Sequence, residues 1–381
     1  MTVASAAPAA HLGGLVARDL IEVTDDVSVL DRGGRWAVVL PYSGAPVLAR
    51  FDNWREGSPE EVGGGWSGPR TWSSSMDQDA YVRAVQRVRE HIARGDVYQV
   101  NACRVMSAEF PDPHRSDVGG LHALLSHGNP APYPAMIRIP GVVEVVSASP
   151  ELFLARRQDE VLTGPIKGTG RTSADLLPKD RAENVMIVDL MRNDLSRVCR
   201  VGSVGVPDLL AEEQHPGLVH LVSRVRGELA PGVSWPELID ATFPPGSVTG
   251  APKLAALDII DRIEPVARGP YCGAIGWVDA DAGTASLAVA IRTFWKDGGL
   301  VHFGTGAGIT WGSDPEGEWR ETQLKAERLI GVASQDWLTE MPAGRSRTAA
   351  CDAHGDADAQ SDADAQSDAH AQSDSMDGAR S

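Results

Sequence analysis

Residues 77–332 contain no linker, and this uninterrupted stretch most limits how the chain can fold. Within it, strand-like segments occur in runs and helix-like segments lie between the runs. Strands that follow one another without long crossovers favour antiparallel pairing. The sequence therefore predicts an α+β fold with large, mostly antiparallel sheets packed with helices, in one domain covering about residues 71–335.

Hydrophobic periodicity places the individual elements. Apolar residues at helical spacing predict a helix over residues 81–94, which Gly95 ends. The same reasoning predicts further helices at 179–191, 252–263 and 318–332, and strands at 97–106, 141–147, 151–155, 218–227, 274–278, 286–294 and 300–305. A glycine-rich segment, 304–308, is expected to follow the last of these strands.

The two ends differ from this central part. Residues 1–70 are strand- and loop-rich and are expected to pack on the core. Residues 343–381 contain near-repeats of Ala-Gln-Ser-Asp-Ala-Asp, with eight aspartates against three arginines and almost no large apolar side chain. Such a segment buries too little to offset its ordering entropy, so a disordered acidic tail is predicted.

Charge and cysteine content exclude several classes. A formal net charge of −17 argues against nucleic acid or an anionic membrane surface as a partner. No apolar run approaches membrane-spanning length, and no signal peptide is recognised. The four cysteines form no CxxC pair, which fits a reducing compartment and a cytoplasmic location.

Two pairs of acidic residues stand three positions apart in predicted helices: Asp180 with Glu183, and Glu318 with Glu321. Each pair shares a helix face. If the two faces met, they would form an all-oxygen site of the kind Mg²⁺ prefers. Acidic pairs at this spacing are common, so a solvated helix face remains the simpler explanation from spacing alone.

Several other residues are candidates for a site. The turn 245–253 can hold a carboxylate through backbone N–H groups and hydroxyls, or can be only a tight turn. Lys167, in an apolar loop flanked by glycine, can act as a nucleophile or be an exposed loop lysine. His220 lies in an apolar strand, where a core histidine is the default. Arg292 can clamp a carboxylate or be a salt-bridge partner.

Taken together, the segments resemble the chorismate-utilising enzymes, which include anthranilate synthase component I, aminodeoxychorismate synthase component I, and the isochorismate and salicylate synthases. The resemblance runs from about Asp77 to Val332, and so many motifs in order make it specific. The motifs are residues 95–101, 129–133, 149–151, 165–169, 183 with 189–195, 220–225, 250–253, 271–276, 291–292, 306–308 and 321–322.

The resemblance implies a Mg²⁺ site. Glu183 and Glu321 match the family's metal ligands, and Asp180 and Glu318 match supporting carboxylates. The metal would bind the ring carboxylate of chorismate.

The resemblance also implies which residues bind chorismate and act on it. Glu151 matches the general acid that protonates the departing 4-hydroxyl, a role that requires a carboxyl held protonated. His220 matches a histidine lining the site, and Ser247 keeps a hydroxyl where anthranilate synthases carry threonine. The residues expected to hold the substrate, including its enolpyruvyl carboxylate, are Tyr271, Arg292, Thr169 and the backbone of Gly306, Ala307 and Gly308.

Two positions discriminate within the family. Gln99 stands where the isochorismate and salicylate synthases carry a water-activating lysine, which makes ammonia the more plausible nucleophile. Lys167 replaces the alanine that anthranilate synthases usually carry. In aminodeoxychorismate synthases that lysine is thought to attack C2, after which ammonia enters at C4.

The expected activity is therefore that of an aminodeoxychorismate synthase component I, with Lys167 as covalent nucleophile. The chain lacks a Cys-His glutaminase motif, so ammonia is expected from a separate glutamine amidotransferase subunit. The alternatives are an anthranilate synthase component I and a catalytically degenerate chorismate-binding subunit.

Overall fold

The computed structural model describes residues 6–112, 115–170, 172–176, 178–215 and 218–335. Residues Met1–Ser334 belong to one compact unit, and a second unit starts at Gln335. The predicted tail, 343–381, lies outside the described residues. Among the helices that the structure describes, none has both the length and the apolar character needed to cross a bilayer.

Every strand pairing in the structure is antiparallel, as predicted for most of them. The strands are β1 (Ala9–Leu12), β2 (Leu15–Thr24), β3 (Arg35–Leu40), β4 (Val47–Glu56), β5 (Ser73–Ser74), β6 (Gln99–Glu109), β7 (Tyr133–Ile139), β8 (Val143–Ser149), β9 (Leu152–Arg157), β10 (Glu160–Gly164), β11 (Ile166–Gly170), β12 (Gly205–His215), β13 (Leu218–Glu228), β14 (Gly250–Ala251), β15 (Ala274–Asp279), β16 (Thr284–Val289), β17 (Thr293–Asp297) and β18 (Leu300–Ile309).

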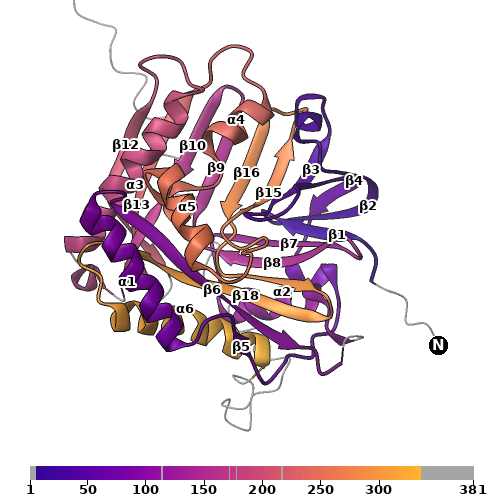
Figure 1. Ribbon diagram of the computed structural model, residues 1–381. Helices are drawn as coiled ribbons and strands as arrows, with labels where there is room; N and C mark the ends of the chain where they lie inside the picture. The colour runs from indigo at the N-terminus through magenta and orange to yellow at the C-terminus, as the bar shows by residue number, and fades with distance from the viewer. Residues whose placement is uncertain (1–5, 113–114, 171, 177, 216–217, 336–381) are drawn as a thin grey trace, which may run out of the picture. The chain divides into compact units, whose positions relative to one another are not determined.

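The strand pairings join into one long strip. It runs through β6, β18, β17, β8, β7, β1, β2, β4, β3, β15, β16, β9, β10 and β13. The N-terminal strands sit in the middle of this strip. β3 pairs with β15 over its whole length, and Figure 1 shows this indigo strand beside the orange one.

The helices are α1 (Gln78–Arg94), α2 (Val118–Gly128), α3 (Pro178–Ser196), α4 (Trp235–Thr242), α5 (Lys253–Ile263) and α6 (Pro315–Ser334). Local capping explains several of their ends. The Asp77 carboxylate accepts from Ala80 N at 2.8 Å at the start of α1, and Gly95 ends it in the left-handed region at φ 82°. Ser234 and Glu237 form a capping box at α4. In Figure 1, α1 and α6 lie near β6 and β18, whereas α3 lies near β12 and β13.

Two sequence predictions were wrong in this part of the chain. The strand predicted over residues 286–294 is two strands, β16 and β17, because Arg292 adopts a left-handed backbone at φ 53°. The glycine-rich segment 304–308 does not follow β18 but lies within it, paired with β6. Glycine there allows close neighbours, since a Cβ at Gly304 would lie 2.1 Å from Tyr271 Cγ.

The break at Arg292 matches a second break at Ser149 and Pro150. β8 pairs with β7 and β17, whereas β9 pairs with β10 and β16, so the chain crosses between two parts of the strip. The two crossings contact each other: Ala148 N donates to Arg292 O at 3.0 Å, and Val289 N donates to Glu151 O at 3.0 Å. Glu151 is thus held at the crossing rather than within a regular strand.

A buried ion pair joins the end of α5 to β6 and to the turn at Val248, and its loss is predicted to be costly. Arg268 and Glu264 pair at 2.6 Å with side chains 1% and 6% exposed, and Arg268 also donates to Val248 O and Asn101 O. Arg268→Ala leaves a buried carboxylate uncompensated. We expect the free energy of unfolding to fall by about 3–5 kcal/mol, measured by urea denaturation.

The matched control is Arg262→Ala, because Arg262 pairs with Asp258 on the surface at 3.5 Å. An exposed pair contributes only about 0–1 kcal/mol. Equal losses in the two variants would contradict a special role for the buried pair.

Candidate active site

Lys167 is the centre of the candidate site. It lies on β11, next to Gly168, whose φ of 79° requires the left-handed region. Its Nζ donates to Ser247 O at 3.2 Å. The charge of Lys167 acts on the carboxyl groups of Glu151, Glu183 and Glu321, which come from three other elements. The structure thus brings the predicted general acid and the principal predicted metal ligands around the amine of Lys167, the predicted nucleophile.

Glu151 has the electrostatic character expected of an acid. Its side chain is buried, only 4% exposed. Burial raises its pKa to about 7, although the neighbouring Ser247 hydroxyl and the charge of Lys167 act to lower it. A carboxyl with this pKa carries a proton over part of the neutral range and can donate it.

Two buried polar atoms near Lys167, Glu151 Oε1 and Ser247 Oγ, have no hydrogen-bond partner among the described residues, and neither amide atom of the buried Gln99 has one. Ser247 Oγ lies near the Glu151 carboxyl but forms no bond of ordinary geometry with it. Buried polar groups are nearly always paired, so unpartnered ones grouped in one place indicate a ligand site. Gln99 is fully buried and faces Gly308, where an added Cβ would lie 2.7 Å from its Nε2.

The acidic pairs lie on α3 and α6, as predicted. Burial raises the pKa of Glu183; Lys167 and Lys179 oppose this, and the like charges of Asp180 and Glu321 add to it. Burial, with Glu321 as a like charge, also raises the pKa of Glu318. The carboxylates of the two helices therefore interact, which the spacing alone did not establish.

A lysine that was not predicted completes this acidic group. Burial acts to raise the pKa of Glu321, but Lys325, Lys179 and Lys167 together lower it below the usual value. Lys325 Nζ bonds Glu321 Oε1 at 2.7 Å and Gly306 O at 3.1 Å, so it links the acidic helix to the glycine-rich strand. Its place four residues after Glu321 was a signal that sequence inspection could have used.

The donor set is suited to a hard divalent cation. Among residues 6–335 as the structure describes them, no group of three His, Cys, Asp or Glu side chains converges closely enough to hold a metal alone. Mg²⁺ does not require one, because it keeps several waters and takes one or two carboxylates plus ligand oxygens. Glu183 and Glu321, as partly exposed like charges in range of each other, fit that pattern.

The residues predicted to hold the substrate lie on neighbouring elements. The buried ring of Tyr271 lies against Gly304, and its hydroxyl lies 3.9 Å from Cys103 Sγ. Burial, together with the nearby Arg328, lowers the pKa of Arg292, and no described carboxylate lies within 4 Å of the Arg292 guanidinium. Arg292 has no described acidic partner and has Arg328 nearby, so the two side chains can form an anion-binding site.

His220 and Thr169 are register partners on two paired strands. Thr169 on β11 is the register partner of His220 on β13, and the histidine is buried at 3% exposure. The strand position predicted for His220 is confirmed.

Comparison with known proteins gives one consistent result. A model of the chorismate binding enzyme family matches residues 47–331. An aminodeoxychorismate synthase component 1 from Klebsiella aerogenes is 35% identical over 77% of this chain and 68% of that protein. An anthranilate synthase component 1 from Streptomyces coelicolor is 38% identical over 69% of this chain and 53% of that protein, so the chain spans about half the length of this relative.

Solved structures show the same fold. Anthranilate synthase component I from Streptococcus pneumoniae superposes with a TM-score of 0.69 at 24% identity, covering 85% of this chain and 89% of that one. A putative isochorismate synthase from Bacillus anthracis gives 0.73 at 22% identity, covering 86% and 97%. The predicted α+β architecture is confirmed by these matches.

Proposed function

Because this chain belongs to the chorismate-binding enzyme family, we propose that it is an aminodeoxychorismate synthase component I, which replaces the 4-hydroxyl of chorismate with an amino group from ammonia. One observation carries the choice of product. Lys167 Nζ is held by Ser247 O at the point where the charges of Glu151, Glu183 and Glu321 meet. An amine there can attack the ring of the same substrate molecule whose departing 4-hydroxyl the acid protonates.

Two displacements account for amination at C4. In the first, Lys167 Nζ forms a bond to C2, the ring double bonds shift, and the C4–O bond breaks. Glu151 gives its proton to the departing oxygen, which leaves as water. In the second, the ammonia nitrogen forms a bond to C4, the double bonds shift back, and the C2–N bond to Lys167 breaks. Direct attack of ammonia at C2 would instead give a 2-amino product.

Other residues hold the substrate in this scheme. The Arg292 guanidinium, which has no described acidic partner, is placed to pair with a substrate carboxylate. Gly308 lies against the buried amide of Gln99, where an added Cβ would lie 2.7 Å from Nε2, whereas the missing Cβ of Gly306 makes room for Cys103. Mg²⁺ bound by Glu183 and Glu321 would supply positive charge for the ring carboxylate.

The ammonia source is proposed to be a separate glutamine amidotransferase subunit, as the "component 1" names of the relatives suggest. The relatives include aminodeoxychorismate and anthranilate synthases at similar identity, so relationship alone does not choose between the products.

Incubation of the purified chain with chorismate, Mg²⁺ and an ammonium salt tests the proposal. We expect no fluorescent anthranilate, and 4-aminobenzoate only after an aminodeoxychorismate lyase is added. Anthranilate formed without a lyase would assign the chain to the anthranilate synthases. Tight chorismate binding with no turnover would indicate a degenerate binding subunit.

The metal site makes a separate prediction. Glu321→Gln removes one charged ligand, so the Mg²⁺ concentration needed for half-maximal activity should rise by about 10–100-fold, and calorimetry should show the same loss in Mg²⁺ affinity with chorismate present. Glu327→Gln is the matched control, because Glu327 is exposed on the same helix. Equal Mg²⁺ affinity in both variants would remove Glu321 from the metal site.

A further inference from the structure

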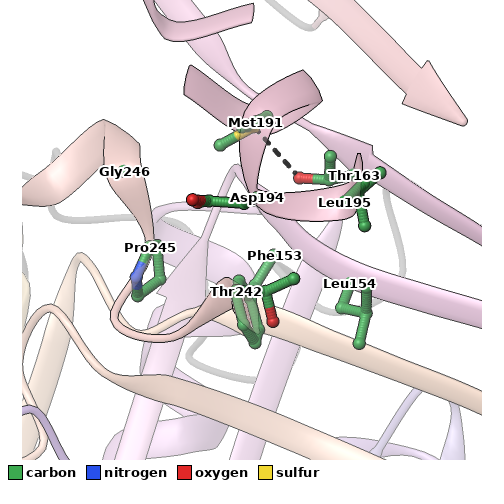
Figure 2. Close-up of a pocket in the computed structure, with 9 residues that line it drawn as sticks. All are labelled: Phe153, Leu154, Thr163, Met191, Asp194, Leu195, Thr242, Pro245 and Gly246. Atoms are coloured by element: carbon green, nitrogen blue, oxygen red, sulfur yellow. Dashed lines mark hydrogen bonds between the residues drawn. The ribbon is translucent and has the colours of Figure 1, made fainter. Parts of the chain in front are cut away.

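A small cavity lies between α3, β9, β10 and the turn that carries Ser247 (Figure 2). Its wall comes from three parts of the chain that are distant in sequence. The lining residues are Phe153, Leu154, Thr163, Met191, Asp194, Leu195, Thr242, Pro245 and Gly246.

The size of this cavity limits its occupant. Its volume is about 10 Å³, which is close to the smallest volume that accommodates one water-sized molecule. Chorismate or any other organic substrate would need a site of several hundred Å³. Only a molecule with a single heavy atom fits.

The polar groups of the wall favour a hydrogen-bond donor. Thr163 Oγ1 donates its proton to Met191 Sδ at 3.2 Å, the bond drawn in Figure 2. Thr242 Oγ1 donates to Leu238 O at 2.8 Å. Since both hydroxyl protons are engaged, these oxygens can form further hydrogen bonds only as acceptors. The third polar side chain, Asp194, is a carboxylate and only accepts.

A buried ion pair fixes the acidic side of the cavity. Lys253 Nζ donates to Asp194 Oδ2 at 2.7 Å and to Thr242 O at 3.2 Å. The two side chains are only 15% and 9% exposed, so the carboxylate is held in place with little access to solvent. An acceptor-rich wall suits ammonia, with three N–H donors and one lone pair, better than water, with two of each.

The cavity is adjacent to the reaction centre through two short chain connections. Gly246 lines it, and the next residue, Ser247, accepts from Lys167 through its carbonyl. Phe153 on β9 also lines it, two residues after Glu151 along the chain. The cavity wall is therefore one residue along the chain from Ser247 and two residues from Glu151.

We propose that this cavity binds one molecule of ammonia, or its ammonium ion, immediately before it reaches the substrate. The inference rests on the proposed amination of chorismate, and it names the site from which the nitrogen enters. Thr163, Thr242 and Asp194 accept its N–H groups, while Phe153, Leu154 and Leu195 exclude other solvent. The site serves free ammonia and glutamine-derived ammonia alike.

Steady-state kinetics with ammonium chloride and saturating chorismate provide the first test. Thr163→Val keeps the side-chain volume but removes one acceptor, so the KM for ammonium should rise about fivefold, with the dissociation constant for chorismate unchanged. Thr163→Ser restores the hydroxyl and should return the KM close to the wild-type value. An unchanged ammonium KM in Thr163→Val, or an equal loss of chorismate affinity, would overturn the site.

A second measurement does not depend on turnover. The chain equilibrated with ¹⁵N-ammonium should give a ¹⁵N-coupled proton resonance of an ion protected from exchange, and Thr163→Val should weaken it. A wild-type chain that fails to aminate chorismate but shows this resonance would refute the proposed function and leave the cavity assignment standing. Normal amination without the resonance and without a change in the ammonium KM would refute the cavity assignment and leave the proposed function standing.

Discussion

Lys167→Ala is expected to lower the rate of 4-amino-4-deoxychorismate formation by at least about 10³-fold, the scale on which loss of a covalent nucleophile acts. Chorismate affinity should change much less. The reason is the position of Lys167 Nζ among the carboxyl groups of Glu151, Glu183 and Glu321. Without the amine, the C2 bond of the first displacement cannot form. The measurement is single-turnover product analysis with ammonium as the nitrogen source.

A second variant distinguishes a nucleophilic role of Lys167 from a purely electrostatic one. Lys167→Arg keeps a positive charge near these carboxylates, but a guanidinium that stays protonated is not a nucleophile. If Lys167 acts only through its charge, the arginine variant retains 4-amination. If it forms the covalent bond, both variants lose it, and mass spectrometry of the wild-type chain under ammonia-free conditions shows a chorismate-derived adduct on the peptide holding Lys167.

The matched control is Lys296→Ala. Lys296 pairs with Glu144 at 2.9 Å on β17 and β8, and has no contact with Lys167 or its carboxylates. Appearance of anthranilate with the Lys167→Ala chain would agree with the covalent role, because ammonia would then attack C2 directly. Retention of 4-amination within tenfold in Lys167→Ala would contradict it.

The helices α1, α3, α5 and α6 were predicted from the sequence because their signals are local, whereas α2 and α4 were missed. The spacing of apolar residues in α1, together with Asp77 and Gly95 at its ends, lies within one short segment. The same is true of the acidic pairs on α3 and α6, whose spacing fixes a shared face. Local sequence did not show that the two faces interact, because that depends on how β11 and β18 place the helices.

The strand order is the part that the sequence did not reveal. Pairing of β3 with β15 joins residues more than two hundred positions apart, and nothing in either strand specifies the other. The left-handed Arg292 was also missed, because an arginine gives no signal for positive φ. The crossing of residues 149–151 with 290–292 follows from these long-range pairings, and it sets the burial of Glu151.

Glu151→Gln is expected to lower kcat/KM for chorismate by about 10²–10⁴-fold, the usual contribution of a positioned general acid. The glutamine has nearly the same size, so the buried crossing keeps its packing. Because burial raises the pKa of Glu151 to about 7, the wild-type chain carries the catalytic proton below that pH and loses it above. The wild-type rate should therefore fall on the alkaline side with an apparent pKa near 7.

The pH profile separates an acid from a residue that only supports the fold. It must be measured at a constant concentration of free ammonia, since the fraction of ammonia also rises with pH. Glu151→Gln should lose the alkaline decline along with most of the rate, because glutamine has no proton to lose. Glu160→Gln, at an exposed position on β10, should keep both. If Glu151→Gln loses rate but retains the decline near pH 7, another group donates the proton. Burial raises the pKa of Glu151, and the charge of Lys167 lowers it. The same experiment therefore tests whether burial at the crossing is what keeps the Glu151 carboxyl protonated.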